Sequence, residues 1–197
     1  MKLLAFSDLH CDLAQAEKLV EQSRDADVVV AVGDFASVHS GLDETVAALA
    51  AIERPVVVVP GNNETEDALR AACAGWESAV LLHGDGTEIE GVRFFGLGGG
   101  IPVTPWDWSF DLTEQAATKL LELCPEGGVL AVHSPPFGHV DASRGHHLGS
   151  RAVLEAIEAR SLAVVLCGHI HESSEQESAI GPTRVINVGP RGRLLEV

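Results

Sequence analysis

The segment Val28-Val29-Val30-Ala31-Val32-Gly33-Asp34 is an unbroken apolar run that ends in a glycine and a carboxylate. A continuous run of valines is typical of a strand that is buried on both faces, as in a parallel sheet covered by helices. A residue that leaves such a strand is held by the sheet, while its side chain faces the crevice where open α/β sheets bind ligands. The segment therefore predicts an α/β fold with Asp34 at a ligand-binding crevice.

Four other apolar runs are also followed by residues that can bind metal. These residues are Asp8 and His10 after Leu3–Phe6, Asn62 after Val56–Val59, His133 after Val129–Val132, and His169 and His171 after Leu162–Cys167. Carboxylates and imidazoles that converge in one crevice need a positive charge between them, because buried polar groups without a partner are costly. A metal centre would supply that charge, so all seven residues, Asp34 included, are candidate metal ligands.

The length and charge of the chain restrict its class. A chain of 197 residues suits one domain with a sizeable core, and we expect a single domain over residues 1–197. Its formal net charge is −16 and it has no basic cluster. Because proteins bind duplex nucleic acid through Lys and Arg that neutralise phosphates, we expect no duplex nucleic acid partner.

The cysteines and the N-terminus indicate a compartment. The four cysteines show no C-x-x-C pairing, so we expect neither disulfides nor a structural zinc site. The first apolar run stops at Asp8, which is too short for a secretory signal, and no stretch is long enough to span a membrane. We therefore expect a reduced, cytoplasmic protein without a membrane partner.

The apolar pattern predicts alternating strands and helices in the first half of the chain. We expect strands at 2–6, 27–32 and 55–59, and helices near 12–23, 43–52 and 64–74. After Val80 we expect a hairpin that turns at Gly91, a loop over 98–110, helices at 113–123 and 150–160, and strands at 128–132, 162–167, 183–188 and 193–197. A parallel half followed by a mixed half favours two sheets packed face to face with helices outside.

The spacing of the candidate ligands suits a site with two metal ions. Residues two apart in an extended segment point to the same side, so Asp8 with His10, and His169 with His171, can each present two ligands. Asn62 adds a neutral oxygen ligand. Two divalent ions about 3.5–4 Å apart can act together on an in-line displacement at phosphorus.

Taken in order, the motifs Asp-x-His, Gly-Asp, Gly-Asn-x-Glu, His and Gly-His-x-His resemble those of the calcineurin-like metallophosphoesterase superfamily, and they span residues 8 to 171. The resemblance implies a four-layer α/β/β/α sandwich of two mixed sheets flanked by helices. It also implies two ions at the strand ends, one held by Asp8, His10, Asp34 and His171, the other by Asp34, Asn62, His133 and His169. Asp34 would bridge them, and a metal-bridging hydroxide would attack the phosphoester.

Two positions depart from the family pattern. Many phosphatases of the family have a His at the catalytic position of Asn63, which protonates the leaving group, and an Asp at the position of Ser37, which orients that His. An Asn cannot act as a general acid near neutral pH, and such help is typically worth about 10²–10⁴ in rate. The paired loss resembles the small prokaryotic phosphodiesterase branch and favours small phosphodiesters, such as nucleotide-derived ones.

The loop after His133 contains three further histidines that could contact substrate: His139, His146 and His147. Such a loop should overhang the ligand crevice. His147 is our first choice for a catalytic acid that replaces the missing His, because it leads into a helix whose N-terminus can face an anion. A solvated loop histidine is the alternative for each of them.

In the loop that follows the hairpin, Trp106, Trp108 and Phe110 alternate with polar residues, and Trp106 is the candidate for substrate binding. It could stack a nucleobase of the substrate, cap the site or form a homodimer contact, with a small satellite core as the alternative. Asn187 follows a late strand and is expected to fix a turn.

The leading hypothesis is a dinuclear metal-dependent phosphodiesterase that acts on a small phosphoester. Mn²⁺ is the first expectation for both ions, although Fe, Co, Ni or Zn would also suit ligands of this N/O type. Two alternatives are a phosphomonoesterase, such as a nucleotidase, and a metal-bound interaction module with little turnover.

Overall fold

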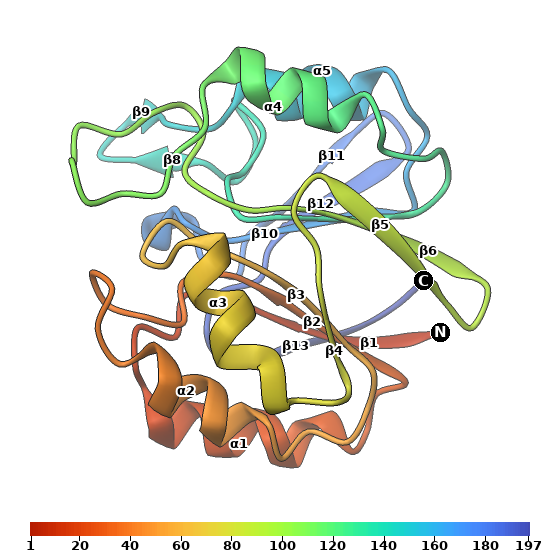
Figure 1. Ribbon diagram of the computed structural model, residues 1–197. Coiled ribbons are helices and arrows are strands. Elements are labelled where there is room, and N and C mark those ends of the chain that lie inside the picture. Colours follow the sequence, from red (N-terminus) through yellow and green to blue (C-terminus); the bar gives the residue numbers. More distant parts are fainter.

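The computed structural model describes all 197 residues, and its two large sheets lie face to face between two layers of helices (Figure 1). The first sheet has the order β13-β1-β2-β3-β4, with β1 at Lys2–Phe6, β2 at Val28–Val32, β3 at Val56–Val59, β4 at Ala79–Leu81 and β13 at Arg193–Glu196. The second has the order β11-β12-β10-β7-β6-β5, with β5 at Asp85–Ile89, β6 at Val92–Leu97, β7 at Val129–Val132, β10 at Val164–Cys167, β11 at Glu177–Ile180 and β12 at Thr183–Asn187.

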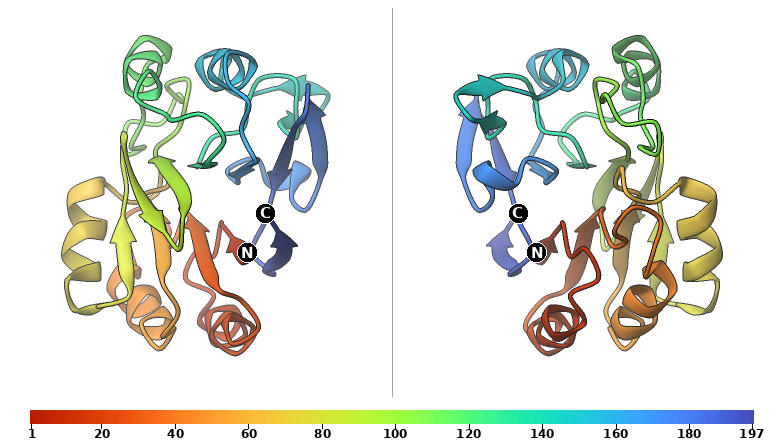
Figure 2. Two further views of the ribbon diagram at one scale, coloured as in Figure 1. Left: turned by 90° about the vertical axis from the view of Figure 1, so that its right-hand side faces the viewer. Right: turned by 90° about the vertical axis from the view of Figure 1, so that its left-hand side faces the viewer.

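The helices form the two outer layers, as the side views show (Figure 2). The first sheet is covered by α1 at Leu13–Ser23, α2 at Leu42–Leu49 and α3 at Glu66–Ala72, and the second by α4 at Glu114–Leu121 and α5 at Arg151–Glu158. Short 3-10 turns are η1 at Cys73–Gly75 and η2 at His171–Ser173. The predicted α/β/β/α sandwich of two mixed sheets flanked by helices is confirmed.

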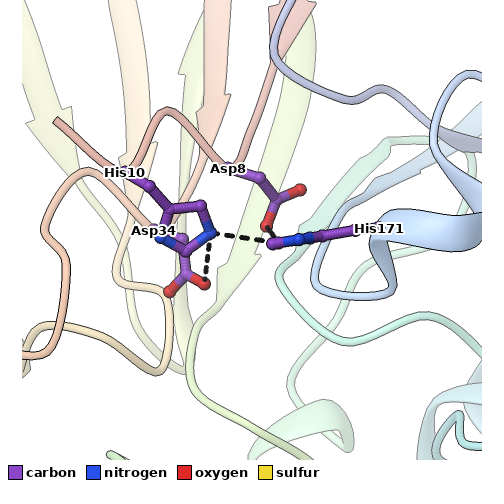
Figure 3. A group of neighbouring side chains, drawn as sticks. All are labelled: Asp8, His10, Asp34 and His171. Atoms are coloured by element: carbon purple, nitrogen blue, oxygen red, sulfur yellow. Dashed lines mark hydrogen bonds and ion pairs between the residues drawn. The ribbon is translucent and has the colours of Figure 1, made fainter. Parts of the chain in front are cut away.

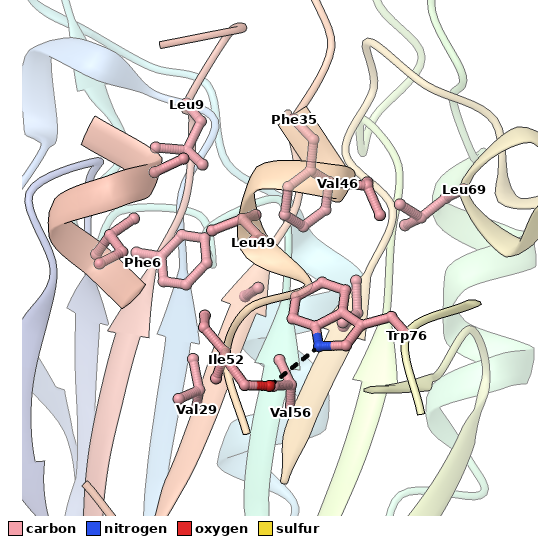
Figure 4. Packing of buried hydrophobic residues seen from close by; sticks show 14 of the residues in the cluster. Phe6, Leu9, Val29, Phe35, Val46, Leu49, Ile52, Val56, Leu69 and Trp76 are labelled. Carbon is pink, nitrogen blue, oxygen red and sulfur yellow. Dashed lines mark hydrogen bonds between the residues drawn. The ribbon is translucent and has the colours of Figure 1, made fainter. Parts of the chain in front are cut away.

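Alternation of side chains along the strands separates the apolar residues into layers. In β2, Val29 and Ala31 pack against the helices, whereas the three other residues pack between the sheets. Figure 4 shows the helix-facing layer, in which Trp76 also donates a hydrogen bond to the carbonyl of Ile52 at 3.3 Å. Both faces of the strand are therefore apolar, which explains the continuous valine runs.

The inner strands of both sheets run parallel, and the antiparallel strands β13, β5 and β11 lie at the edges. The carboxyl ends of β1, β2 and β3 therefore meet those of β7 and β10 at one end of the sandwich. A small hairpin of β8 at Ala142–Ser143 and β9 at His146–His147 projects there, at the left of Figure 1. The chain termini lie together elsewhere, where the Met1 amine donates to the Val197 carbonyl at 2.8 Å.

Most predicted elements are present with slightly shorter bounds, and the strands β4, β11, β8 and β9 were not predicted. β4 and β11 are short, partly exposed edge strands. β8 and β9 have two residues each, in a segment that we expected to be a loop. Such short elements lack enough residues to show a periodic pattern. None of the helices combines the length and the apolar character needed to cross a membrane.

Candidate metal centre

The seven predicted ligands converge at the carboxyl ends of five strands. Four of them have a left-handed backbone: Asp8 (φ 57°), His10 (φ 43°), Asp34 (φ 59°) and His169 (φ 67°). A positive φ is uncommon for residues other than glycine, and such conformations cost about 1–3 kcal/mol each and cluster at functional sites. The sharp turns at the strand ends aim these side chains at one another instead of along the strands.

The first group of ligand atoms belongs to Asp8, His10, Asp34 and His171, and all of these atoms lie within 4.8 Å of one another (Figure 3). The Nε2 atoms of His10 and His171 are 3.0 Å apart. His10 Nε2 is 3.6 Å from Asp34 Oδ2, and His171 Nε2 is 3.7 Å from Asp8 Oδ1. This group has the size and composition of a site for one cation.

The second group contains Asp34, His133 and His169, again within 4.8 Å. Asn62 joins it, because its Oδ1 lies 3.3 Å from His133 Nε2 and 3.0 Å from His169 Nδ1. Asp34 belongs to both groups: Oδ2 faces His10, and Oδ1 lies 3.5 Å from His133 Nε2. The structure thus brings together all seven residues in the two sets that the family resemblance implied.

The hydrogen bonds around the imidazoles show that the donor set fits divalent cations. His133 Nδ1 lies 2.8 Å from the Val32 carbonyl, and His10 Nδ1 lies 3.2 Å from the Ala36 carbonyl. A carbonyl only accepts, so each neutral ring protonates Nδ1 and directs the Nε2 lone pair at Asp34. Lone pairs that face carboxylate oxygens repel unless a cation or a proton lies between them.

Burial and neighbouring charges set the protonation states. Burial would raise the pKa of Asp8, but its contacts with His171, His133 and Ser7 outweigh burial and lower that pKa to about 2. Burial, together with His133, lowers the pKa of His169 to about 4. Asp8 is therefore ionised and His169 is neutral at neutral pH, and these are the forms that bind metal.

Glu64 braces the two loops that present Asp34 and Asn62. It is fully buried, and Oε1 accepts hydrogen bonds from the N–H groups of Asp34 at 2.8 Å and Gly61 at 2.7 Å. Oε2 accepts from the N–H of Ala36 at 3.0 Å. Burial and the Asp34 carboxylate raise the pKa of Glu64 to about 7. We did not predict this role, although the Gly-Asn-x-Glu motif contains the residue.

The close approach of these two loops requires a glycine at position 61. A Cβ on Gly61 would lie 2.1 Å from both the backbone nitrogen and Oδ1 of Asp34. No other residue leaves room for this contact.

Asn63 holds the Asp34 carboxylate. Its backbone N–H donates to Asp34 Oδ1 at 2.9 Å, and its side-chain amide donates to Oδ2 at 2.8 Å. Its own Oδ1 accepts from the N–H of Val38 at 2.9 Å. Asn63 stands where many phosphatases of the family have an acid, and here it orients the metal ligand Asp34. An amide can do this without transferring a proton.

Asn187 fixes the turn that contains His169, as the sequence suggested. Its amide donates to the carbonyls of Gly168 at 3.2 Å and Ile170 at 3.1 Å, on either side of the histidine. It also reaches the Val140 carbonyl at 3.4 Å, in the loop that leads to the hairpin. A fully buried side chain at the end of β12 thus positions a ligand at the end of β10.

A cavity of about 590 Å³ opens beside the two ligand groups. Five of the candidate ligands form one side: His10, Asp34, Asn62, His169 and His171. Another side is the loop of residues 102–108, where the rings of Trp106 and Trp108 stack with centroids 5.5 Å apart. The hairpin region adds Ser143 and Leu148, and Ile170 and Glu172 complete that side.

The loop after His133 contributes Ser143 and Leu148 to the cavity lining, whereas its three histidines are not among the lining residues. His139 Nδ1 lies 3.3 Å from Ser178 Oγ, and His146 is exposed on β9. His147 Nδ1 lies 2.6 Å from Oδ1 of Asp141, a fully buried carboxylate that also accepts from two backbone N–H groups. His147 is thus held by Asp141, because a buried charge needs a partner.

Comparison with known families identifies the type of domain. A model of the calcineurin-like phosphoesterase superfamily domain matches residues 1–195. The chain is also 30% identical over 95 residues to the UPF0046 protein K07C11.7 of Caenorhabditis elegans. That similarity covers 48% of this chain and 32% of the relative, so the chain spans about a third of the length of the curated relative that it matches.

Several solved structures share the fold. The protein TT1561 of Thermus thermophilus has a TM-score of 0.78 at 20% identity, over 95% of this chain and 88% of that one. A dimetal phosphatase from Danio rerio has a TM-score of 0.65 at 15% identity, over 95% of this chain and 86% of that one. The phosphopantetheinyl hydrolase of Mycobacterium tuberculosis has a TM-score of 0.63 at 15% identity, over 95% of this chain and 88% of that one. At these identities the likeness establishes the architecture alone.

Proposed function

This chain belongs to the calcineurin-like phosphoesterase superfamily, and from that premise we propose that it hydrolyses small phosphodiesters, nucleotide-derived ones among them. Membership makes it a metal-dependent hydrolase that acts on phosphoester bonds. The main support for the proposal is that Asp34 belongs to both ligand groups. A shared carboxylate can hold two divalent ions close enough to act on one phosphate.

Each part of the site has a defined task in this proposal. Asp8, His10, Asp34 and His171 would hold one ion, and Asp34, Asn62, His133 and His169 the other; Mn²⁺ is our first choice for both. When bound, the ions would lower the pKa of water and screen the charge that develops on the phosphoryl oxygens. The protein keeps the Asp34 carboxylate aimed at both groups through Asn63 and Glu64.

The contacts of Asn63 support a diester as the substrate. Its amide donates to Asp34 and accepts from the N–H of Val38, and because an amide is not an acid near neutral pH, Asn63 cannot protonate a leaving group. Apart from the candidate ligands, no residue that lines the cavity is a histidine, and the position of Ser37 carries no Asp to orient one. Hydrolysis would then depend on the metal ions, with leaving groups that depart without a general acid.

A paired assay tests the proposal. The purified protein is loaded with Mn²⁺, Fe²⁺, Co²⁺, Ni²⁺ or Zn²⁺ and assayed with bis(p-nitrophenyl) phosphate and p-nitrophenyl phosphate, which release the same leaving group. Because the leaving group is the same, the comparison isolates the class of ester, and we expect kcat/KM to be higher for the diester than for the monoester. Asp34→Asn should lose this activity, whereas the exposed Asp25→Asn should keep it.

The other outcomes are equally informative. A monoester preference would contradict the diesterase and favour a phosphomonoesterase such as a nucleotidase. If the protein binds metal but hydrolyses neither ester, a metal-bound interaction module would be the better description.

A further inference from the structure

The side of the cavity that faces the ligand groups is apolar, aromatic and open. Val103, Trp106 and Leu148 line it and are large apolar side chains with exposed fractions of 58%, 50% and 47%. Exposed apolar residues scattered singly over a surface need no explanation, but a group beside a polar site indicates a binding surface.

Contacts with the metal centre fix the position of this wall. The carbonyl of Asn62 accepts from the N–H of Phe110 at 3.0 Å, and the Asn62 amide donates to Ser109 Oγ at 2.8 Å. His39 Nε2 lies 2.7 Å from the carbonyl of Trp108, on whose ring Trp106 stacks with 11° between the planes. One candidate ligand therefore holds the end of the loop that contains Trp106.

The cavity contains no cationic side chain to receive a second phosphate. None of its lining residues is Lys or Arg, and its charged residues apart from the histidines are Asp34 and Glu172. Glu172 is oriented by a hydrogen bond that its Oε2 accepts from the backbone N–H of Arg144 at 2.8 Å. The side chain of Arg144 is 90% exposed, and its Nε lies 3.9 Å from Oε1 of Glu172 at the rim, but Arg144 is not among the residues that line the cavity. A second phosphate would lose water against a lining that contains no Lys or Arg, and the carboxylate of Glu172 would repel it.

We infer that the substrate has a single phosphate and a flat, uncharged aromatic group that stacks on Trp106, and that the site rejects substrates with a second phosphate. This inference rests on the proposed function, because the metal centre must hold the first phosphate. It adds to that function the chemistry of the group attached to the phosphate. A mononucleotide ester or a simple aryl ester would meet both requirements.

Binding of phosphonates, which cannot be hydrolysed, tests this directly. The Mn²⁺-loaded protein is titrated in a calorimeter with methylphosphonate, phenylphosphonate and para-phosphonophenylphosphonate. We expect phenylphosphonate to bind about tenfold tighter than methylphosphonate, within the range for aromatic stacking on one side chain. The second phosphonate group should weaken binding at least about threefold relative to phenylphosphonate.

Variants assign the two effects to residues. Trp106→Ala should weaken phenylphosphonate about fivefold and leave methylphosphonate unchanged, while the exposed Leu123→Ala, away from the cavity, should change neither. Glu172→Gln should reduce the penalty of the second phosphonate group, whereas Glu158→Gln, on α5, should not.

The results separate the inference from the function on which it rests. If methylphosphonate binds but phenylphosphonate gains nothing, or if the doubly charged ligand binds best, the inference is overturned and the phosphoesterase stands. If no phosphonate binds to the metal-loaded protein, both are overturned.

Discussion

At the scale of single residues, the site depends on side chains that bind no metal themselves. Glu64 accepts three backbone hydrogen bonds beneath the centre, and Asn63 donates twice to the carboxylate that the two ligand groups share. Partners of this kind orient ligands, and their loss typically reduces metal affinity by about 10–100-fold.

Glu64→Gln is therefore expected to weaken metal binding without touching a ligand. The new amide would place an N–H donor either against the N–H of Ala36 or against those of Asp34 and Gly61, so at least one buried donor loses its acceptor. We expect Mn²⁺ affinity to fall about 10–100-fold and the free energy of unfolding to fall by about 1–3 kcal/mol. Calorimetric metal titration and urea unfolding measure both. The exposed Glu53→Gln is the control, and equal values for the two variants would contradict the bracing role.

The double variant Ser37→Asp/Asn63→His would rebuild the acid pair that phosphatases of the family have. Because a general acid helps poor leaving groups most, the ratio of rates for phenyl and p-nitrophenyl esters should rise, by at least about tenfold. The ratio is the proper measurement, since loss of the Asn63 contact to Asp34 will lower both rates. An unchanged ratio would show that a histidine at this position cannot reach the leaving group.

At the scale of elements, the ligand-bearing turn after β10 is held from two sides. Asn187, at the end of β12, clamps the carbonyls on either side of His169. The β8–β9 hairpin is tied to η2 by Ser173 Oγ, which donates to the Ala142 carbonyl at 2.9 Å. Asp141 in turn holds the hairpin through His147 and two backbone N–H groups.

These contacts predict different outcomes for His147→Ala and Asp141→Ala. His147 does not line the cavity. Its loss should therefore leave kcat for the diester within about threefold of the parent value and the shape of the pH–rate profile unchanged. Asp141→Ala removes the acceptor of three hydrogen bonds and should destabilise the protein by about 2–4 kcal/mol. It should also speed hydrogen exchange across residues 138–149. A large loss of kcat in His147→Ala would instead restore the histidine as a catalytic acid.

The arrangement of elements was largely predictable from sequence, whereas the lining of the site was not. Buried strands such as β2 show themselves as valine runs, because both faces pack against apolar layers. β4 and β11 escaped prediction because edge strands are half exposed and short. The contact of His147 with Asp141 was not predicted, because it depends on how the loop itself folds.

At the scale of the whole molecule, the metal centre ties together the two sheets. Three of the strands whose ends supply ligands belong to the first sheet and two to the second. The chain also has a net charge of −16, and two carboxylates, Asp8 and Asp34, lie close together in the centre itself. Cations bound there should therefore stabilise the folded chain by linkage and by reducing repulsion.

Removal of metal with a chelator should lower the melting temperature. Saturation at about 100 times Kd is worth about 2.7 kcal/mol per site, and about 2–4 °C per kcal/mol applies to a chain of this size. We expect a drop of about 5–11 °C for each site that is emptied, and about 11–22 °C when both are, measured by calorimetry with and without Mn²⁺. Raising the salt concentration should recover part of the loss in the metal-free protein and change the loaded protein less. Identical melting curves would contradict a structural contribution from the centre.

By itself, the sequence determined the layers of the fold and the seven candidate ligands, because buried runs and polar strand ends are patterns within a few consecutive residues. Only the tertiary structure decided what the neighbouring residues do. Asn63 contacts Asp34 across 29 positions of the chain, and Asn62 contacts His169 across 107. Such contacts, like the aromatic wall without a cation, depend on which loops the packed sheets bring together, and no local pattern records that.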